Sequence, residues 1–239
     1  MRTALLLAAV ALAAGCGGEG ADDEPLTVFA ARSLTEVFQR LASDARFNFA
    51  GSDELATQLR EGARADVYAA ASPRYPIELH DEGLVEQPRA FATNRLVIVV
   101  PADNPAGIDS LDDLGQQGVK LVIGAEGVPI GDYTRTVLGS AGRTGVLERV
   151  VSEEEDVKGV LGKVRLGEAD AGFVYATDAR AAGTAVRAIE LPAAIQAVVR
   201  YPVAVVGSSG RREEAEEFIA LLLSSRGQDL LRQAGFAPP

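Results

Sequence analysis

We predict an α/β fold with mainly parallel sheets, and three observations support it. Short apolar segments that fit β-strands alternate along the chain with segments of helical spacing. Strand-like runs such as residues 96–100 are apolar at every position, which is typical of strands covered on both faces. The chain has 239 residues, of which 47% are hydrophobic, so it can build two lobes of roughly 100 residues each.

The individual elements follow from apolar spacing and from the residues that end each run. We expect strands at residues 26–30, 47–50, 65–70, 96–100, 120–124, 171–175 and 198–206, and helices at 33–42, 55–60, 133–138, 157–166, 213–223 and 228–233. In the first helix, Leu34, Val37, Phe38 and Leu41 fall on one face. Pro101 ends the strand at 96–100, and a glycine ends the helix at 55–60.

The N-terminus has the pattern of a secretory signal. Arg2 precedes an apolar run at residues 4–14, which is about half the length of a membrane-spanning helix. The sequence Ala-Ala-Gly before Cys16 resembles a bacterial lipoprotein signal, so we expect residues 1–15 to be removed and Cys16 to carry a lipid. A plain signal peptide with an incidental cysteine is the alternative. Residues 16–25 are rich in Gly and acidic residues and are predicted to form a flexible tether.

Composition excludes several kinds of site. The formal net charge is −11, from 34 acidic and 23 basic residues, without a basic block, which argues against nucleic-acid binding. One His and one Cys argue against a zinc site, an iron–sulfur site or a disulfide framework. We therefore predict no cofactor and no metal bound directly by side chains.

Four predicted helix starts are the candidate binding elements. Ser33 and Glu36 have the spacing of a capping box, Ser52 opens the next helix, and further helices begin near Ile130 and at Val157. In open α/β folds, ligands bind at the carboxyl ends of strands, where the unpaired N–H groups of helix starts give a partial positive charge. Each start taken alone fits an ordinary cap, and spacing alone does not show that the four converge.

Several segments together resemble the periplasmic molybdate-binding proteins, the receptors of molybdate ABC importers. They occur in the family's order and cover residues 26–236: TVFAARSLT at 27–35, FAGS at 49–52 followed by LATQL, GARADVY at 62–68, VPIGDY at 128–133, EDV at 155–157, GFVY at 172–175, YPVAVV at 201–206 and a closing GF at 235–236. The resemblance implies a two-lobed periplasmic binding protein with the ligand in the cleft. It also implies lobe 1 at residues 26–98 and 203–239, and lobe 2 at 99–202.

The same resemblance implies the residues that hold the oxyanion. Ser33 and Ser52 would donate hydroxyl and backbone hydrogen bonds, Ile130 and Val157 would donate backbone N–H groups, and Tyr175 would donate its phenolic O–H. Molybdate is a dianion with four acceptor oxygens and no proton, so it requires donors only. Hydrogen bonds to a charged group contribute roughly 1.5–3 kcal/mol each, so five neutral donors are sufficient for tight binding.

The function implied is a lipid-anchored, extracytoplasmic and monomeric receptor, not an enzyme, that captures molybdate or tungstate and delivers it to an ABC permease. Sulfate or phosphate as the ligand is the first alternative. Asp132 bears on it, because a carboxylate facing the cleft would accept the proton of hydrogen phosphate, whereas one facing solvent would only favour the helix start. An enzyme with Ser33 as nucleophile is a further alternative, but the sequence supplies no evident base for it.

Overall fold

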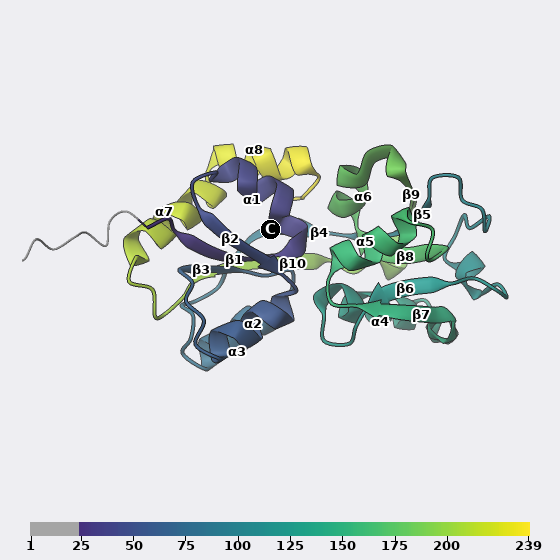
Figure 1. The fold of residues 1–239 in the computed structure, drawn as a ribbon, viewed down its shortest axis with the longest axis horizontal. Coiled ribbons are helices and arrows are strands. Elements are labelled where there is room, and N and C mark those ends of the chain that lie inside the picture. Colours follow the sequence, from purple (N-terminus) through teal and green to yellow (C-terminus); the bar gives the residue numbers. More distant parts are fainter. Residues whose placement is uncertain (1–23) are drawn as a thin grey trace, which may run out of the picture.

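The computed structural model describes residues 24–239, which form two α/β lobes side by side (Figure 1). Each lobe contains a five-stranded sheet, in the orders β2-β1-β3-β10-β4 and β7-β6-β8-β5-β9. The predicted signal peptide, the predicted lipidation site at Cys16 and most of the predicted tether lie outside the described residues. Within residues 24–239, no helix is both long enough and apolar enough to cross a membrane.

The first lobe combines both ends of the described chain. Its strands are β1 (Thr27–Ala31), β2 (Arg46–Ala50), β3 (Val67–Ala69), β4 (Arg89–Asn94) and β10 (Val199–Val205), and its helices are α1 (Thr35–Leu41), α2 (Ser52–Arg60), α3 (Arg74–Asp81), α7 (Arg212–Leu223) and α8 (Ser225–Ala234). Helices α2 and α3 cover one face of the sheet, and α1, α7 and α8 cover the other (Figure 1). Strands β1 and β3 are therefore buried on both faces.

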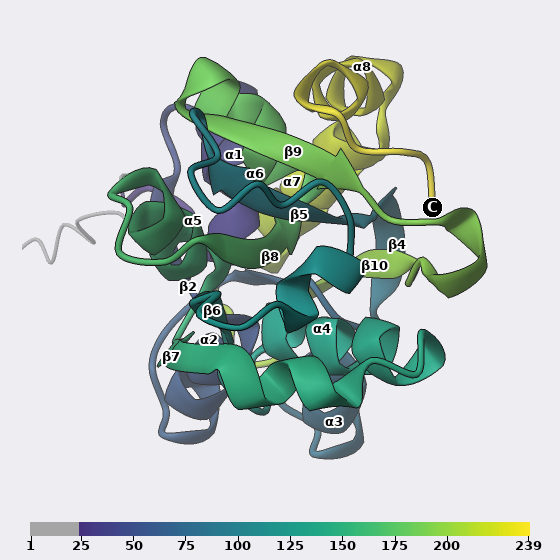
Figure 2. The same cartoon turned by 90° about the vertical axis from the view of Figure 1, so that its right-hand side faces the viewer.

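The second lobe is formed by the middle of the chain. Its strands are β5 (Leu96–Pro101), β6 (Leu121–Gly124), β7 (Val150–Glu154), β8 (Ala171–Tyr175) and β9 (Val186–Glu190), and its helices are α4 (Pro129–Ser140), α5 (Val157–Arg165) and α6 (Ala176–Ala182). Seen along the long axis of the molecule, α4 lies on one side of this sheet and α5 and α6 on the other (Figure 2). All residues of β5, β6 and β8 are buried.

The predicted α/β class is confirmed, but the sheets are mixed where we expected mainly parallel ones. In the first sheet β1 pairs in parallel with β2 and β3, whereas β10 runs antiparallel to β3 and β4. In the second, β6 pairs in parallel with β7 and β8, whereas β5 runs antiparallel to β8 and β9. The chain passes between the lobes twice, from β4 to β5 and from β9 to β10. The antiparallel strands β5 and β10 are the first strands after these passages. An apolar run predicts a buried strand but does not show in which direction the strand runs.

Those two passages also bear on the lobe boundaries. The predicted boundaries at 98/99 and 202/203 fall inside β5 and β10, and each of these strands pairs within a single sheet. We propose to divide the chain at Arg95, between β4 and β5, and in the segment between β9 and β10. Lobe 1 then comprises residues 26–94 and 199–239.

Candidate functional site

A small cavity lies where the two lobes meet. Its volume is about 20 Å³ for the centre of a water-sized sphere, somewhat more than the 10–15 Å³ that one water needs, so it suits a ligand of a few atoms. It is lined by the ends of strands and the starts of helices from both lobes: Ala31, Arg32, Ser33, Ala50, Gly51, Ser52, Ala71, Val128, Pro129, Ile130, Asp156, Val157 and Tyr175. The structure thus brings together all five residues predicted to hold the oxyanion; that they bind it remains a prediction.

Ser52 is the first residue of α2 and is almost completely buried. Its hydroxyl oxygen accepts a hydrogen bond from the backbone N–H of Ala71, with 3.0 Å between the two heavy atoms. Because that bond occupies the oxygen as an acceptor, the hydroxyl proton remains available for a ligand. The first turn of α2 adds backbone N–H groups that have no partner within the helix.

Ser33 lies in a short 3₁₀ turn, Arg32–Leu34, directly after β1. The predicted capping box with Glu36 is wrong: α1 begins at Thr35, and no side chain caps it. The hydroxyl of Ser33 instead lies 3.0 Å from that of Tyr201 on β10, in the interior of the protein. Glu36 contacts Lys158 of the other lobe, with 2.8 Å between the carboxylate and the ammonium. A tertiary contact has therefore replaced the local one at both ends of the motif.

Ile130 and Val157 belong to the first turns of α4 and α5, as the motifs implied. Pro129 precedes Ile130 at the first position of α4, where a missing N–H costs nothing. At α5, Asp156 is the N-cap, and its carboxylate accepts the N–H groups of Lys158 and Gly159 at 2.7 and 3.0 Å. The cap leaves the N–H of Val157 unused, so both helix starts offer backbone donors at the cavity.

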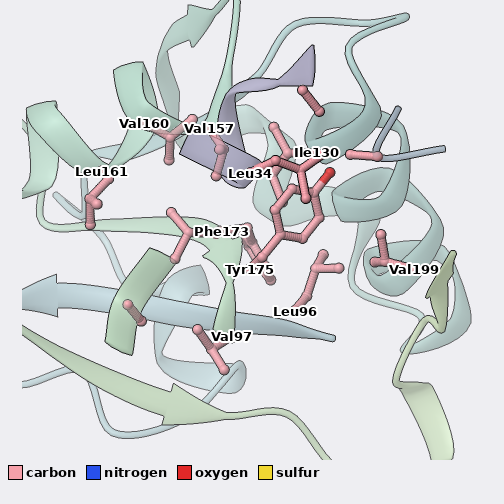
Figure 3. Close-up of a cluster of buried hydrophobic side chains, with 14 of the residues drawn as sticks. Leu34, Leu96, Val97, Ile130, Val157, Val160, Leu161, Phe173, Tyr175 and Val199 are labelled. Atoms are coloured by element: carbon pink, nitrogen blue, oxygen red, sulfur yellow. The ribbon is translucent and has the colours of Figure 1, made fainter. Parts of the chain in front are cut away.

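Tyr175 ends β8, and its hydroxyl is the one buried side-chain group of the cavity lining that has no hydrogen-bond partner in the described part of the chain. Its ring packs among apolar side chains from both lobes, and its hydroxyl lies beside Ile130 (Figure 3). That hydroxyl is buried and has no hydrogen-bond partner among the described residues. Burial, and secondarily the neighbouring Tyr201, raise the pKa of Tyr175 well above its usual range, so the phenol keeps its proton. An unpaired buried O–H is costly, and a ligand oxygen at the cavity would pair it.

The two charged residues that line the cavity are paired with each other. Arg32 and Asp156 form an ion pair across the cleft, with 2.9 Å between Nε and Oδ2. Asp132 does not line the cavity: one carboxylate oxygen accepts the N–H of Gly127 at 2.9 Å, and the other lies 3.5 Å from Arg74. The orientation of Asp132 that would favour hydrogen phosphate is therefore not the one in the structure. In the part of the chain that the structure describes, no group of three His, Cys, Asp or Glu residues could hold a metal ion.

Sequence reasoning missed the contacts that hold the lobes together. Besides the Arg32–Asp156 and Glu36–Lys158 pairs, Arg74 approaches Asp132 and the Tyr75 hydroxyl donates to the carbonyl of Gly127. A further contact lies at Gly51, where a Cβ would be 2.7 Å from the carbonyl oxygen of Glu155 in the other lobe. None of these contacts follows a local pattern; all depend on how the lobes face each other. The structure thus has the cleft closed.

A small cavity between two α/β lobes, with neutral hydroxyl and backbone donors and one ion pair in its lining, is typical of a solute-binding protein. The chain belongs to the family described as bacterial extracellular solute-binding protein, whose profile matches residues 26–237. The family description places its members outside the cytoplasm.

Individual relatives agree with this assignment. The chain is 39% identical to the molybdate-binding protein ModA of Mycobacterium tuberculosis over 224 residues, 90% of this chain and 85% of that protein. Its fold is similar to that of the periplasmic molybdate-binding protein of Azotobacter vinelandii, with a TM-score of 0.80, 20% identity, and coverage of 90% and 99% of the two chains. It is also similar to the sulfate-binding protein SubI of M. tuberculosis, with a TM-score of 0.77, 19% identity, and coverage of 90% and 86%. At these identities the structures establish the fold alone.

Proposed function

We propose that this protein is the extracytoplasmic receptor for molybdate, and for tungstate, of an ABC importer. The observation that carries the proposal is the buried, unpaired hydroxyl of Tyr175 in a cavity whose other polar groups are donors or are already paired. A fully deprotonated tetrahedral dianion satisfies such a site, because every one of its oxygens accepts. The 39% identity to a protein named as molybdate-binding supports the choice of metal, and family membership supports delivery to a permease.

Phosphate and sulfate fit the site less well. Hydrogen phosphate carries a proton that needs an acceptor. Asp132 does not line the cavity, and the one carboxylate that does, that of Asp156, already accepts from Arg32 and from two backbone N–H groups. Sulfate has the same charge as molybdate but shorter bonds to oxygen, so donors placed for the larger tetrahedron cannot all reach it.

Binding without catalysis is the function that the cavity supports. The lining residues include no His or Lys, and the one lining carboxylate, that of Asp156, pairs with Arg32 and caps α5, so Ser33 has no free base to activate it as a nucleophile. His80, the single histidine of the chain, hydrogen-bonds the carbonyl of Val85 through Nδ1, and neither residue lines the cavity. We propose a receptor that needs no cofactor. We also propose that it works as a monomer, because residues of one chain form the whole lining of the cavity.

The two serines provide the experiment. Each of the variants Ser33→Ala and Ser52→Ala should weaken molybdate binding about ten- to a hundredfold, because each removes a donor to a charged ligand. Calorimetric titration of the folded variants measures this, with circular dichroism as the check on folding. Wild-type affinity in both variants would remove the serines from the site and contradict the proposal.

We further propose that Cys16 carries a lipid that anchors the receptor to the membrane. The small residues before Cys16 and the Gly-rich acidic tether after it support this. The variant Cys16→Ser should move the protein from the membrane fraction to the soluble fraction. Unchanged fractionation, together with an unmodified native Cys16 in mass spectrometry, would contradict the anchor.

A further inference from the structure

A chain of buried polar groups connects the passage between the lobes to the hydroxyl of Ser33. It runs from Asn94 at the end of β4, through Tyr201 on β10, to Ser33 at the cavity, and we call it the hydroxyl relay. All three residues are buried, with at most 7% of their surface exposed. Asn94 and Tyr201 are not among the five residues predicted to bind the oxyanion, and neither of them lines the cavity.

The direction of the relay begins with the amide of Asn94. Its oxygen accepts the backbone N–H of Arg95 at 2.9 Å, so its nitrogen must point the other way. That nitrogen donates to the Thr177 hydroxyl at 2.9 Å and lies 3.5 Å from the oxygen of Tyr201. The two N–H bonds of the amide therefore point toward the hydroxyl oxygens of Thr177 and Tyr201, and the Tyr201 oxygen accepts the longer of the two hydrogen bonds.

Tyr201 passes this polarity to Ser33. Its ring is held by edge-on contacts with three aromatic rings, those of Phe91, Tyr175 and Phe236. Burial raises the pKa of Tyr201 far above its usual range, so the hydroxyl keeps its proton. Among the described residues, the only polar atom within reach that can accept this proton is the Ser33 oxygen, 3.0 Å away. Ser33 therefore accepts from Tyr201, and its own proton is left for the ligand.

We propose that Tyr201 is a positioning residue that keeps Ser33 a donor and thereby excludes protonated oxyanions from the site. The inference rests on the proposed function and extends it to selectivity. Ser52 is held in the same state by a backbone N–H, that of Ala71. Each serine oxygen accepts one such bond, which turns its own proton toward the ligand, so a ligand that carries a proton meets a donor at both serines. The Asp156 carboxylate at the cavity is held by Arg32 and by two backbone N–H groups. The donor to Ser52 is a backbone N–H, whereas the donor to Ser33 is the side chain of Tyr201, so only the second can be removed by substitution.

The variant Tyr201→Phe keeps the ring and removes the relay's last donor. Molybdate binding should weaken about tenfold, because a donated bond no longer polarises the Ser33 hydroxyl. The binding of hydrogen phosphate should not weaken, because the Ser33 oxygen no longer accepts from Tyr201 and can accept the proton of the ligand. The measurement is calorimetric titration with molybdate at pH 8, alone and in competition with phosphate, which gives the ratio of the two affinities. That ratio should fall at least tenfold.

Two further variants separate the relay from general damage to the fold. Tyr68→Phe removes another fully buried hydroxyl, which donates to the backbone carbonyl of Ser52 at 2.6 Å and not to a hydroxyl, so it should leave the affinity ratio unchanged. In a Ser33→Ala background, Tyr201→Phe should have no additional effect on molybdate affinity, because Tyr201 acts through Ser33. Additive effects, or an equal loss for both anions, would overturn the proposal.

The relay and the choice of ligand fail in different ways. A wild type that prefers sulfate to molybdate would contradict the proposed ligand only, and the ratio of sulfate to phosphate would then test the relay. A wild type that prefers hydrogen phosphate, or that binds none of these anions, would overturn both.

Discussion

The hydroxyl of Tyr175 has opposite effects on ligand binding and on stability. In the closed form that the structure describes it is buried without a partner among the described residues, so it contributes nothing favourable through hydrogen bonding. With a ligand bound it would donate to an anion. A donor kept unpaired in this way favours ligand binding at the expense of the stability of the closed form.

The variant Tyr175→Phe should therefore weaken molybdate binding about ten- to a hundredfold and leave the unliganded protein as stable as the wild type or more so. Tyr68→Phe is the matched comparison, because its hydroxyl is equally buried but has a partner; it should cost about 1 kcal/mol of stability. Urea unfolding without ligand and calorimetric titration measure the two effects. Equal destabilisation by both substitutions would contradict the assignment of Tyr175.

Asp178 makes stability depend on pH. It lies on α6, is 1% exposed, and has Lys158 3.1 Å away as its cation. Burial raises the pKa of Asp178 to about 6 from 3.8, and the lowering by Lys158 only partly offsets it. The folded protein thus holds this proton more tightly than the unfolded chain does, so the contribution of Asp178 to stability is present below about pH 4 and is lost as the pH rises to about 6.

The effect is on the order of a few kcal/mol, because each unit by which the folded and unfolded pKa values differ corresponds to about 1.4 kcal/mol. Asp178→Asn removes the titration, so the wild type should lose roughly that much more stability than the variant between pH 4 and pH 6.5. Urea unfolding of both proteins across this range measures the difference, in which the titration of the other carboxyl groups cancels. Parallel profiles would show that Asp178 ionises normally.

At the scale of single elements, the start of α4 depends on a glycine. A Cβ at Gly131 would lie 2.1 Å from the carbonyl oxygen of Ala125 and 2.3 Å from that of Gly124. Helix α4 can therefore meet the end of β6 closely enough to present Ile130 at the cavity only because this position has no side chain.

The variant Gly131→Ala should push α4 away from β6, with a loss of at least about 2 kcal/mol of stability and of most molybdate binding. Gly139 is the matched control, because it lies in the same helix and a Cβ there meets nothing within 4 Å. Gly139→Ala should be neutral or stabilise by up to about 1 kcal/mol. Thermal unfolding and titration compare them, and similar behaviour of the two variants would refute the close approach.

Which elements the sequence predicts depends on where they lie in the sheets. The central strands β1, β3, β5, β6, β8 and β10 were all expected, because they are buried on both faces and read as apolar runs. Of the four strands at sheet edges, β2 was expected because of its two phenylalanines, whereas β4, β7 and β9 were not. Their residues alternate between partly buried and exposed or carry charges, as in the sequence Val-Val-Ser-Glu-Glu of β7. One-sided pairing leaves too weak an apolar pattern to detect.

The site was predictable as far as local motifs determine it. The helix starts at Ser52 and Val157 have the expected bounds, and Asp156 caps α5 as its position suggests. The cap at Ser33 failed, because its hydroxyl bonds to Tyr201, 168 positions along the chain. Helix starts are encoded by neighbouring residues, whereas hydroxyl partners in the interior are set by packing between distant strands, and a sequence pattern does not show these.

At the scale of the whole molecule, binding is coupled to closure of the two lobes. The cavity exists only where residues of both lobes meet, and its closed form needs Gly51 next to the carbonyl of Glu155. The backbone of Gly51 has φ −57° and ψ 143°, which alanine also adopts. A methyl group at this position would also lie 2.7 Å from Oδ1 of Asp53 in the same lobe, but that atom is the end of a side chain, whereas the contact with the other lobe is with backbone. The substitution therefore acts mainly on the contact between the lobes.

The variant Gly51→Ala should fold normally and bind molybdate about ten- to a hundredfold more weakly, because overpacking costs about 1–3 kcal/mol in the closed form alone. Small-angle X-ray scattering should show the wild type becoming more compact with ligand and the variant doing so only at higher ligand concentration. Wild-type compaction at the same concentration would argue against closure at Gly51.

The cavity between the lobes, in which the groups free to bind a ligand are neutral donors, should select a deprotonated tetrahedral dianion of the size of molybdate. Calorimetric titration of the purified protein with molybdate, tungstate, sulfate and phosphate, at one pH and one ionic strength, tests it most directly. We expect molybdate and tungstate to bind at least a hundredfold more tightly than sulfate or phosphate, a difference of about 2.7 kcal/mol. Tighter binding of phosphate or sulfate than of molybdate would contradict this account.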